Sequence, residues 1–174
     1  MIEVFRCLIC GETYLGSKKP SNCPFCGAHS KYLIKASLYK DQFKVKIGSV
    51  SKKNLRQTLQ LEMSSAEFYL CASKVTKNLE LQGMFKRLSK VEYEHADAVC
   101  KYLRIKQPAL KYSKKSCFPK DMKNLMDAHR REDHAIRLYR QFQKEAKEPN
   151  MKRLFTALVQ IETDHLKLLE KKMK

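Results

Sequence analysis

Apolar side chains recur at helical spacing through most of the chain after about residue 50. One stripe of positions three or four apart contains Leu81, Phe85, Leu88, Glu92, His95, Val99 and Tyr102. Residues so spaced share a helix face, and only Glu92 and His95 interrupt this apolar face. Stripes of this kind predict four helices, over about residues 51–78, 79–104, 119–147 and 149 to near the end. The pattern therefore predicts a mainly α chain.

The helical pattern is duplicated. Glu-Tyr-Glu-His at residues 92–95 has a counterpart in Glu-Thr-Asp-His at residues 162–165, each with a Phe and a Leu at matching upstream positions. A glutamate on the preceding helix, Glu62 and then Glu132, completes each copy. Residues 51–174 are therefore predicted to form two helical hairpins, with one carboxylate from each helix directed at a common core.

These carboxylates predict a metal site. Four buried carboxylates would repel one another and lose their hydration, a cost that a lone ion pair rarely recovers. Two divalent cations would balance them, and a glutamate from two helices with Glu-x-x-His from the other two is the pattern of dimetal four-helix bundles. The predicted ligands are Glu62, Glu92, His95, Glu132, Glu162 and His165. Such ligands suit iron or manganese, with zinc as a third option.

Two other interpretations of these residues compete with a metal site. A single Glu-x-x-His is usually a solvated pair, but duplication inside an apolar stripe favours metal binding, which leaves polar core residues bonded to one another as the alternative. Glu67 lies more than one turn beyond Glu62 on the same helix, away from the level of Glu92, so Glu62 is the preferred ligand.

The N-terminal region contains a second candidate metal site. Two Cys-x-x-Cys pairs, Cys7 with Cys10 and Cys23 with Cys26, place four sulfurs for tetrahedral coordination. A glycine follows each pair and tolerates the positive φ often required there. Zinc at this site would be structural, whereas iron would form a one-electron centre.

Three segments follow from these patterns. Residues 1–37 are predicted to form a small metal module, 38–50 a basic linker and 51–174 the four-helix bundle. Residues 105–120 contain Pro108 and Pro119 and show little periodicity. Their length suits a crossover along the bundle better than a tight turn.

Cysteine usage and the N-terminus bear on the compartment. Seven cysteines, four of them in tight pairs, fit a reducing compartment and a metal site better than a disulfide framework. Of the others, Cys71 and Cys100 are expected to be small residues in helices, and Cys117 is left over. No secretory signal or membrane-spanning apolar run is present. The sequence therefore predicts a cytoplasmic protein.

The formal net charge of +18 is spread along the chain. Lys111, Lys114, Lys115 and Lys120 make its densest patch. A spread of this kind mostly indicates solvated faces with some non-specific attraction to polyanions or acidic partners. Without a readable recognition helix or aromatic platform, we expect no specific nucleic-acid role.

Both halves of the chain resemble one family. Cys-Leu-Ile-Cys-Gly at residues 7–11 with Cys-Pro-Phe-Cys-Gly at 23–27 resembles the rubredoxin-like module of rubrerythrins, and the duplicated hairpin resembles their ferritin-like bundle. Most familiar rubrerythrins carry the module at the C-terminus, so this chain is similar to the reversed-order members. The resemblance implies a non-haem di-iron peroxidase that receives electrons through the rubredoxin-like iron.

The resemblance also concerns residues around the dimetal ligands. Tyr69 and Tyr139 match family tyrosines that orient carboxylates or a bound peroxide, with core aromatics as the alternative. Many rubrerythrins carry a further metal-binding carboxylate where this chain has Ala135, so a step that moves iron between a carboxylate and a histidine would be missing. His129, one turn before Glu132, is expected to be a hydrogen-bonded core histidine, with an extra ligand or proton donor as the alternative.

The predicted function is peroxide reduction in defence against oxidative stress, with hydrogen peroxide or O2 as oxidant. Electrons would come from a donor protein or reductase, and the family implies a homodimer. Two rival hypotheses are iron oxidation or handling by a ferritin-like protein, and a non-enzymatic zinc-ribbon adaptor.

Overall fold

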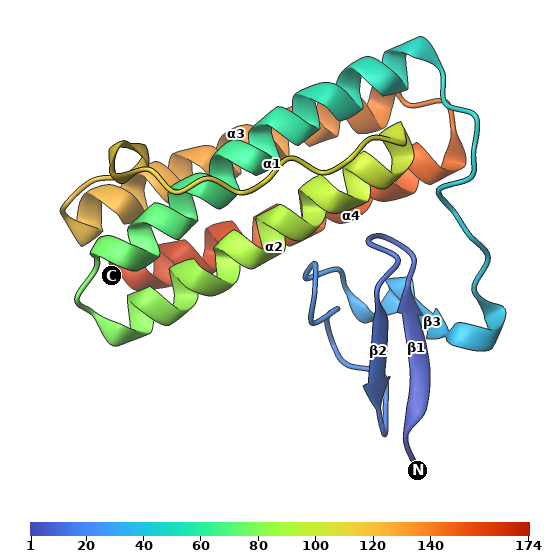
Figure 1. The fold of residues 1–174 in the computed structure, drawn as a ribbon, viewed down its shortest axis with the longest axis horizontal. Helices are drawn as coiled ribbons and strands as arrows, with labels where there is room; N and C mark the ends of the chain where they lie inside the picture. The colour runs from blue at the N-terminus through green and yellow to red at the C-terminus, as the bar shows by residue number, and fades with distance from the viewer.

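A computed structural model describes all residues from 1 to 174, and it shows a four-helix bundle preceded by a small sheet module (Figure 1). The helices are α1 (Ser49–Val75), α2 (Leu79–Leu103), α3 (Asp121–Glu145) and α4 (Pro149–Met173). The strands are β1 (Glu3–Cys7), β2 (Thr13–Gly16) and β3 (Leu33–Lys35). The predicted fold class, a mainly α ferritin-like bundle after a small metal module, is confirmed. None of the helices combines the length and apolar character needed to cross a membrane.

Local sequence signals set the helix ends. The Asn78 side chain accepts hydrogen bonds from the backbone N–H groups of Glu80 and Leu81, so it caps α2. Pro149 lies in the first turn of α4, where its missing N–H costs nothing. Helix α3 begins at Asp121, two residues later than expected, because the segment before it is held by Asn124. That buried side chain accepts from Phe118 N (2.8 Å) and donates to Phe118 O (2.9 Å).

The N-terminal module, residues 1–37, is built on an antiparallel sheet with strand order β2-β1-β3. Phe5 on the central strand lies opposite Tyr14 on one side and Lys35 on the other. Short 3-10 turns, Ser30–Tyr32 and Ala36–Leu38, flank β3. The buried side chains of the module and of the bundle form one continuous apolar cluster, so the two parts share a core.

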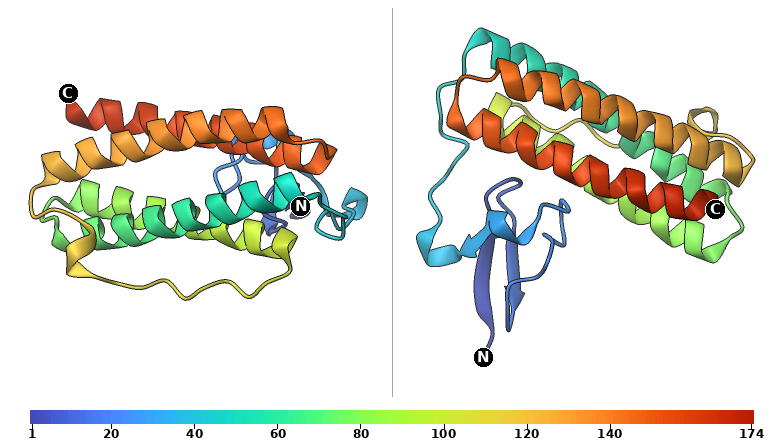
Figure 2. Two further views of the ribbon diagram at one scale, coloured as in Figure 1. Left: turned by 90° about the horizontal axis from the view of Figure 1, so that it is seen from above. Right: turned by 180° about the vertical axis from the view of Figure 1, so that it is seen from behind.

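The module packs against α2 and α4 of its own chain (Figure 2). The Tyr32 hydroxyl donates to Gln160 Oε1 (3.1 Å), and His29 Nε2 lies 2.7 Å from Asp164 Oδ2. On the α2 side, the Arg87 guanidinium donates to the backbone oxygen of Phe25 (3.2 Å). These contacts fix the module next to the middle of the bundle.

Residues 104–120 cross the bundle from the end of α2 to the start of α3, as the crossover prediction requires (Figure 1). Hydrogen bonds hold this connector to the helices. Gln107 Nε2 donates to Tyr93 O (2.7 Å), the Tyr93 hydroxyl donates to Pro108 O (3.0 Å), and Lys111 N donates to Glu67 Oε1 (3.3 Å). A 3-10 turn, Lys114–Ser116, follows.

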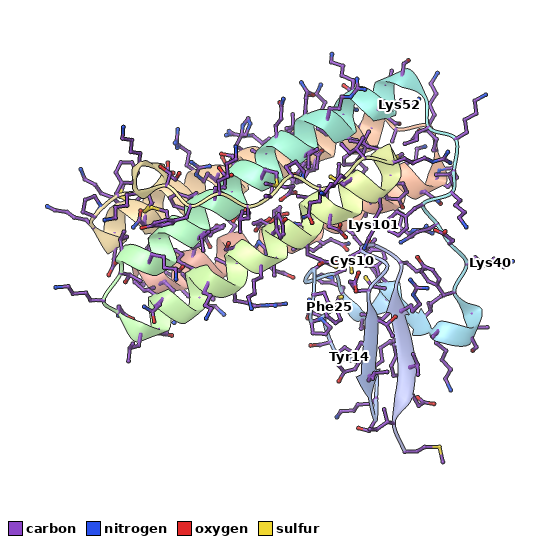
Figure 3. All side chains as sticks on the ribbon, viewed as in Figure 1. Cys10, Tyr14, Phe25, Lys40, Lys52 and Lys101 are labelled. Atoms are coloured by element: carbon purple, nitrogen blue, oxygen red, sulfur yellow. A yellow bond between two sulfur atoms is a disulfide. The ribbon has the colours of Figure 1, made fainter.

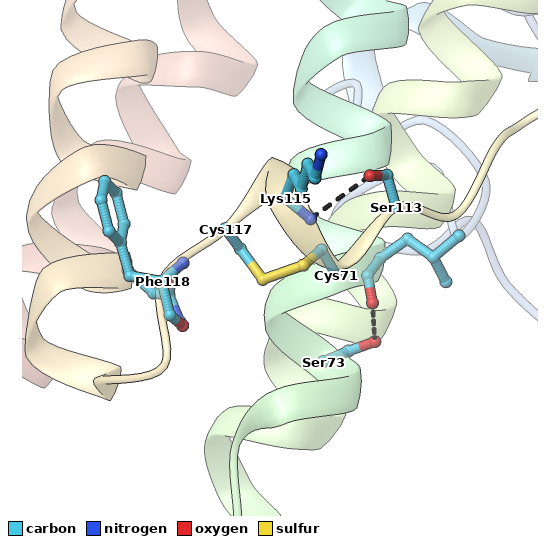
Figure 4. The surroundings of a disulfide bond; sticks show 8 residues. Cys71, Ser73, Ser113, Lys115, Cys117 and Phe118 are labelled. Carbon is cyan, nitrogen blue, oxygen red and sulfur yellow. Dashed lines mark hydrogen bonds between the residues drawn. A yellow bond between two sulfur atoms is a disulfide. The ribbon is translucent and has the colours of Figure 1, made fainter.

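A disulfide between Cys71 on α1 and Cys117 in the connector corrects the prediction that these cysteines are unpaired (Figure 4). Cys100 is free and buried in α2, as expected. The periodicity of α1 placed Cys71 on a helix, but the partner depends on the path of an aperiodic segment. The bridge joins residues 46 positions apart, and closing a loop of that size in the unfolded chain stabilises the fold by about 4 kcal/mol in the chain-entropy model.

The disulfide predicts a thiol count. Air-oxidised protein, denatured and stripped of metal, should titrate five thiols with Ellman's reagent, because two of the seven are bridged. The Cys117→Ser variant should unfold at a lower temperature than wild type under oxidising conditions and at a similar temperature under strong reductant. A count of seven in the oxidised wild type would contradict the bridge.

Candidate metal centres

The four-cysteine site consists of Cys7, Cys10, Cys23 and Cys26, all buried. The loop after β1 carries the first pair, and a matching turn before β3 carries the second. Gly11 and Gly27, directly after the pairs, have φ of 83° and 77°, so their positions favour glycine as predicted. Both pairs present their sulfurs to one point beside the bundle.

The sulfur spacing fits a tetrahedral metal. The Sγ atoms of Cys7 and Cys26 lie 3.8 Å apart, and those of Cys10 and Cys23 lie 3.9 Å apart. A tetrahedron with metal–sulfur bonds of about 2.3 Å has edges of about 3.8 Å. Contact with the Cys10 sulfur lowers the pKa of the Cys7 and Cys23 thiols, while the Cys23 sulfur raises the pKa of Cys10, so a metal would have to displace the protons that remain.

Iron at this site predicts a visible colour. Oxidised, iron-loaded protein should show sulfur-to-iron charge-transfer absorption that bleaches on reduction. The Cys26→Ser variant should lose this absorption, whereas Cys100→Ser, which removes a buried cysteine outside the site, should keep it. A colourless protein with one tightly held zinc after iron-rich growth would contradict an electron-transfer role.

The carboxylate–histidine cluster gathers all six predicted bundle residues at one level of the four helices. It divides into two overlapping groups: Glu62, Glu92, His95 and Glu162, and Glu92, Glu132, Glu162 and His165. Within each group the ligand atoms lie within 4.8 Å of one another. Bonds of about 2.0–2.2 Å to oxygen and nitrogen place opposite ligands roughly 4 Å apart, so each group fits one ion. Glu92 and Glu162 belong to both groups, in the position of bridging ligands.

The cluster is buried, yet several of its polar atoms have no partner. Both Glu162 oxygens, Glu92 Oε1 and His165 Nδ1 are enclosed and form no hydrogen bond of acceptable geometry. Buried polar groups are almost always hydrogen-bonded, and buried charges are paired or coordinate metals. The same atoms lie close together as charged groups: His165 Nδ1 is 2.8 Å from Glu162 Oε2 and 3.1 Å from Glu92 Oε1. The donor set therefore fits two divalent cations better than an internal hydrogen-bond network.

The pKa values of the cluster residues are shifted by burial and by the neighbouring charges. Burial raises the pKa of Glu62 and Glu132 well above the usual range for a carboxyl group. Burial by itself would lower the pKa of both histidines, but the surrounding carboxylates outweigh it and raise the pKa of His95 and His165 well above the ordinary value. Without cations the cluster can reduce its charge only by binding protons, which metals would displace.

Two tyrosines donate hydrogen bonds to glutamates of the cluster. The Tyr139 hydroxyl donates to Glu62 Oε1 (2.5 Å), and the Tyr69 hydroxyl donates to Glu132 Oε1. Each tyrosine thus holds the glutamate of the opposite hairpin. Burial raises the pKa of both phenols well above the usual value, so they stay protonated. These contacts are the geometry expected of residues that orient carboxylates.

His95 connects the two sites. Its Nδ1 lies 3.0 Å from Glu92 Oε2 and 3.4 Å from an oxygen of Glu62. On the other edge of the ring, Nε2 lies 2.8 Å from the backbone oxygen of Cys26, a member of the four-cysteine site. A carbonyl oxygen can only accept, so Nε2 carries a proton, and the raised pKa of His95 means that Nδ1 also carries one toward the carboxylates when no metal is bound. A metal that displaces the Nδ1 proton would find the Nδ1 lone pair directed at the cluster, because the Cys26 carbonyl holds the other proton on Nε2.

Three residues weighed in the sequence lie outside the cluster. Glu67 is half-buried and accepts from the connector, which agrees with the preference for Glu62. Both predictions for His129, a core histidine or an extra ligand, are corrected. Its side chain is 36% exposed and its Nε2 lies 3.6 Å from Glu170 Oε1, away from the cluster. Ala135 is buried beside Glu132, and α3 supplies one carboxylate to the cluster.

Sequence reasoning missed Lys101. Its Nζ donates to the backbone oxygen of Cys10 (2.9 Å) and to Glu12 Oε1 (3.0 Å), and it pairs with Asp97 Oδ2 at 2.7 Å (Figure 3). Lys101 thus holds α2 and the first cysteine pair together. In the sequence it is one lysine of a solvated helix face, and no local pattern distinguishes it from its neighbours.

Comparison with known proteins bears on both sites. The family model described as the rubredoxin-like domain of rubrerythrin matches residues 5–33, and the rubrerythrin model matches residues 123–174. The second segment contains Glu132, Glu162 and His165, while the first hairpin is linked to it by the internal duplication. No curated protein matches the chain.

Among solved structures, wild-type KatB, a manganese catalase from Anabaena, superposes with a TM-score of 0.59 at 15% identity, over 78% of this chain and 78% of that chain. The likeness is one of fold, the ferritin-like four-helix bundle. The two family matches are more specific than this likeness of fold. The rubredoxin-like match precedes the rubrerythrin match along the chain, the reversed order, which confirms the resemblance seen in the sequence. This domain pair and the two buried clusters support an oxidoreductase-type function.

Proposed function

We propose that this protein reduces hydrogen peroxide at the carboxylate–histidine cluster and receives the electrons through iron in the four-cysteine site. The observation that supports this most directly is the contact between His95 Nε2 and Cys26 O. One imidazole ring spans the gap between a ligand residue of one site and the other site. An electron that leaves the cysteine site could pass through the Cys26 side chain and carbonyl group, across this hydrogen bond and into the ring.

The overall reaction takes two electrons and two protons for each hydrogen peroxide, breaks its O–O bond and releases two waters. Two iron or manganese ions held by Glu62, Glu92, His95, Glu132, Glu162 and His165 would supply the two electrons for that cleavage. The role of the surrounding residues is to position the glutamates of the cluster and to shield the cluster from water. Tyr69 and Tyr139 hold Glu132 and Glu62 in place through their hydroxyl groups.

The surroundings of the cluster favour a small oxidant. The rings of Phe85 and Phe155 lie 6.0 Å and 6.3 Å from those of Tyr69 and Tyr139, and both phenylalanines are fully buried. This apolar layer excludes bulk water and strengthens electrostatic interactions inside. Peroxide or O2 can reach a site enclosed in this way, whereas a large organic substrate cannot.

The two rival hypotheses, iron handling and a zinc-ribbon adaptor, assign no electron-transfer role to the cysteine site. Iron oxidation or handling would use the same six bundle residues without a redox-active N-terminal iron. A zinc-ribbon adaptor would need no metal in the bundle. The contact between the cysteine site and His95 favours the electron-transfer function, because neither rival requires the two sites to touch.

Metal analysis of protein grown with ample iron tests the proposal. We expect about three irons per chain, two in the bundle and one in the cysteine site. Manganese in the bundle with iron in the cysteine site would keep the redox proposal and change its metal. Zinc in the cysteine site would favour iron handling if the bundle is loaded and the adaptor if it is empty.

We propose three further features that accompany this function. The first is an electron-donor protein or reductase, which must reduce the cysteine site. The second is a homodimer, as the family implies. The third is a cytoplasmic location, where the disulfide between Cys71 and Cys117 would be unusual, since stable disulfides are rare in reducing compartments.

A further inference from the structure

A basic cleft lies at the end of the bundle where the linker joins α1. It has a volume of about 400 Å³ and is lined by Lys44, Val45, Lys46, Ile47, Lys52, Arg56, Tyr102, Leu103 and Arg104. Three segments contribute: the linker, the first turns of α1, and the end of α2. Lys52 projects from α1 at this end of the molecule (Figure 3). The metal sites and the residues of the proposed reaction are not part of the cleft.

The charge of the cleft is one-sided. Five of its nine residues are cations, and none is acidic. Lys44 lies 3.5 Å from Asp41 as an exposed pair, while Lys46, Lys52, Arg56 and Arg104 form no salt bridge. Arg130 and Arg137 on α3, by contrast, pair with Asp127 and Asp133. Uncompensated cations that converge on a concave surface repel one another, and an anion bound there would relieve the repulsion.

The floor of the cleft is apolar. Ile47 and Tyr102 are buried beneath it, and the Tyr102 ring packs edge-on against Phe43 with ring centroids 4.7 Å apart. Val45 and Leu103 add half-buried apolar surface. Small-molecule sites combine an apolar lining with a few placed polar groups within about 300–1,000 Å³. A cleft of this size with a cationic rim suits a compact organic anion better than an extended polymer.

We propose that this cleft binds a small organic molecule with at least two phosphate groups, of the nucleoside diphosphate class. The phosphates would lie against Lys46, Lys52, Arg56 and Arg104, and the base or sugar would cover the floor over Ile47 and Tyr102. Arginine is suited to bidentate phosphate contacts and lysine to point-charge contacts. The proposal accounts for a part of the +18 charge that the redox function does not use.

The test is calorimetric titration of the full-length, metal-loaded protein with adenosine diphosphate at near-physiological salt. We expect saturable binding of one molecule per chain. Lys52→Gln combined with Arg56→Gln should weaken it about tenfold or more, because two charge-assisted contacts are lost. The matched control is Lys86→Gln with Lys90→Gln, two exposed lysines one turn apart on α2, which remove the same charge and should leave the affinity unchanged.

Four outcomes would overturn the proposal. Absence of measurable binding would remove the site. Equal weakening in both double variants would mean diffuse attraction to the net charge. Inorganic pyrophosphate should bind several-fold more weakly than adenosine diphosphate, because it leaves the apolar floor uncovered; equal affinity would reject an organic ligand. Tighter binding of a duplex oligonucleotide, lost to the same extent in both double variants, would indicate a polyanion surface instead.

Discussion

Hydrogen peroxide added to the fully reduced, iron-loaded protein should restore the visible absorption of the four-cysteine iron, and Glu162→Ala should slow this recolouring by about 100-fold or more. Glu162 belongs to both groups of the carboxylate–histidine cluster, so its removal takes away the place where peroxide is proposed to react. In wild type, peroxide should take electrons from the bundle first and from the cysteine site afterwards. Stopped-flow absorbance after mixing measures both the delay and the rate.

The matched control for this experiment is Glu170→Ala. Glu170 lies two turns further along α4 and faces His129 at the surface, so its loss should leave recolouring at the wild-type rate. If wild type and Glu162→Ala recolour equally fast, the cysteine-bound iron is oxidised independently of the bundle. The peroxidase mechanism would then be wrong even if both metal sites are occupied.

Removal of single glutamates should change the metal count in a graded way. Glu92→Ala is expected to abolish metal binding in the bundle, because Glu92 contributes to both groups, whereas Glu132→Ala should leave one of two ions, because Glu132 contributes to one. Both variants should keep the metal in the cysteine site. Elemental analysis after extensive dialysis, with protein quantified by amino-acid analysis, gives the ratio for each variant.

Glu80→Ala is the control for the metal count. This exposed glutamate on α2 pairs with Lys172 and contacts neither group, so two ions should remain. Retention of both ions in Glu92→Ala would remove that residue from the ligand set. Loss of both ions in Glu132→Ala would mean that the two positions fill only together, which would contradict separable groups.

The helices and the six cluster residues were predictable because helical periodicity converts sequence spacing directly into a shared face. Glu92 and His95 lie on one face of their helix whatever surrounds them. His129 shows where this reasoning ends. His129 stands three residues before Glu132, whereas His95 stands three residues after Glu92, so His129 is turned about 60° toward the opposite edge of the face, where the neighbouring helix decides between core and solvent.

The contact between His95 and Cys26 could not be predicted in the same way. The linker is long enough to place the module on several surfaces, including another chain, and spacing does not distinguish among them. The bond depends on how the turn at Gly27 packs on α4, where an added Cβ would lie 3.2 Å from Ile161 Cγ2. The disulfide was missed for a related reason, since the position of Cys117 follows from the path of a segment without periodicity.

The docking of the module on its own bundle makes electron transfer between the two sites a unimolecular event. Its rate constant should therefore be the same in dilute and concentrated solution. Two chains that carry different defects, one in a cysteine and one in a glutamate, should not restore each other's activity when mixed. In a homodimer the two subunits would turn over as independent reaction units, each with a complete path from the Cys26 carbonyl through His95 to the carboxylates.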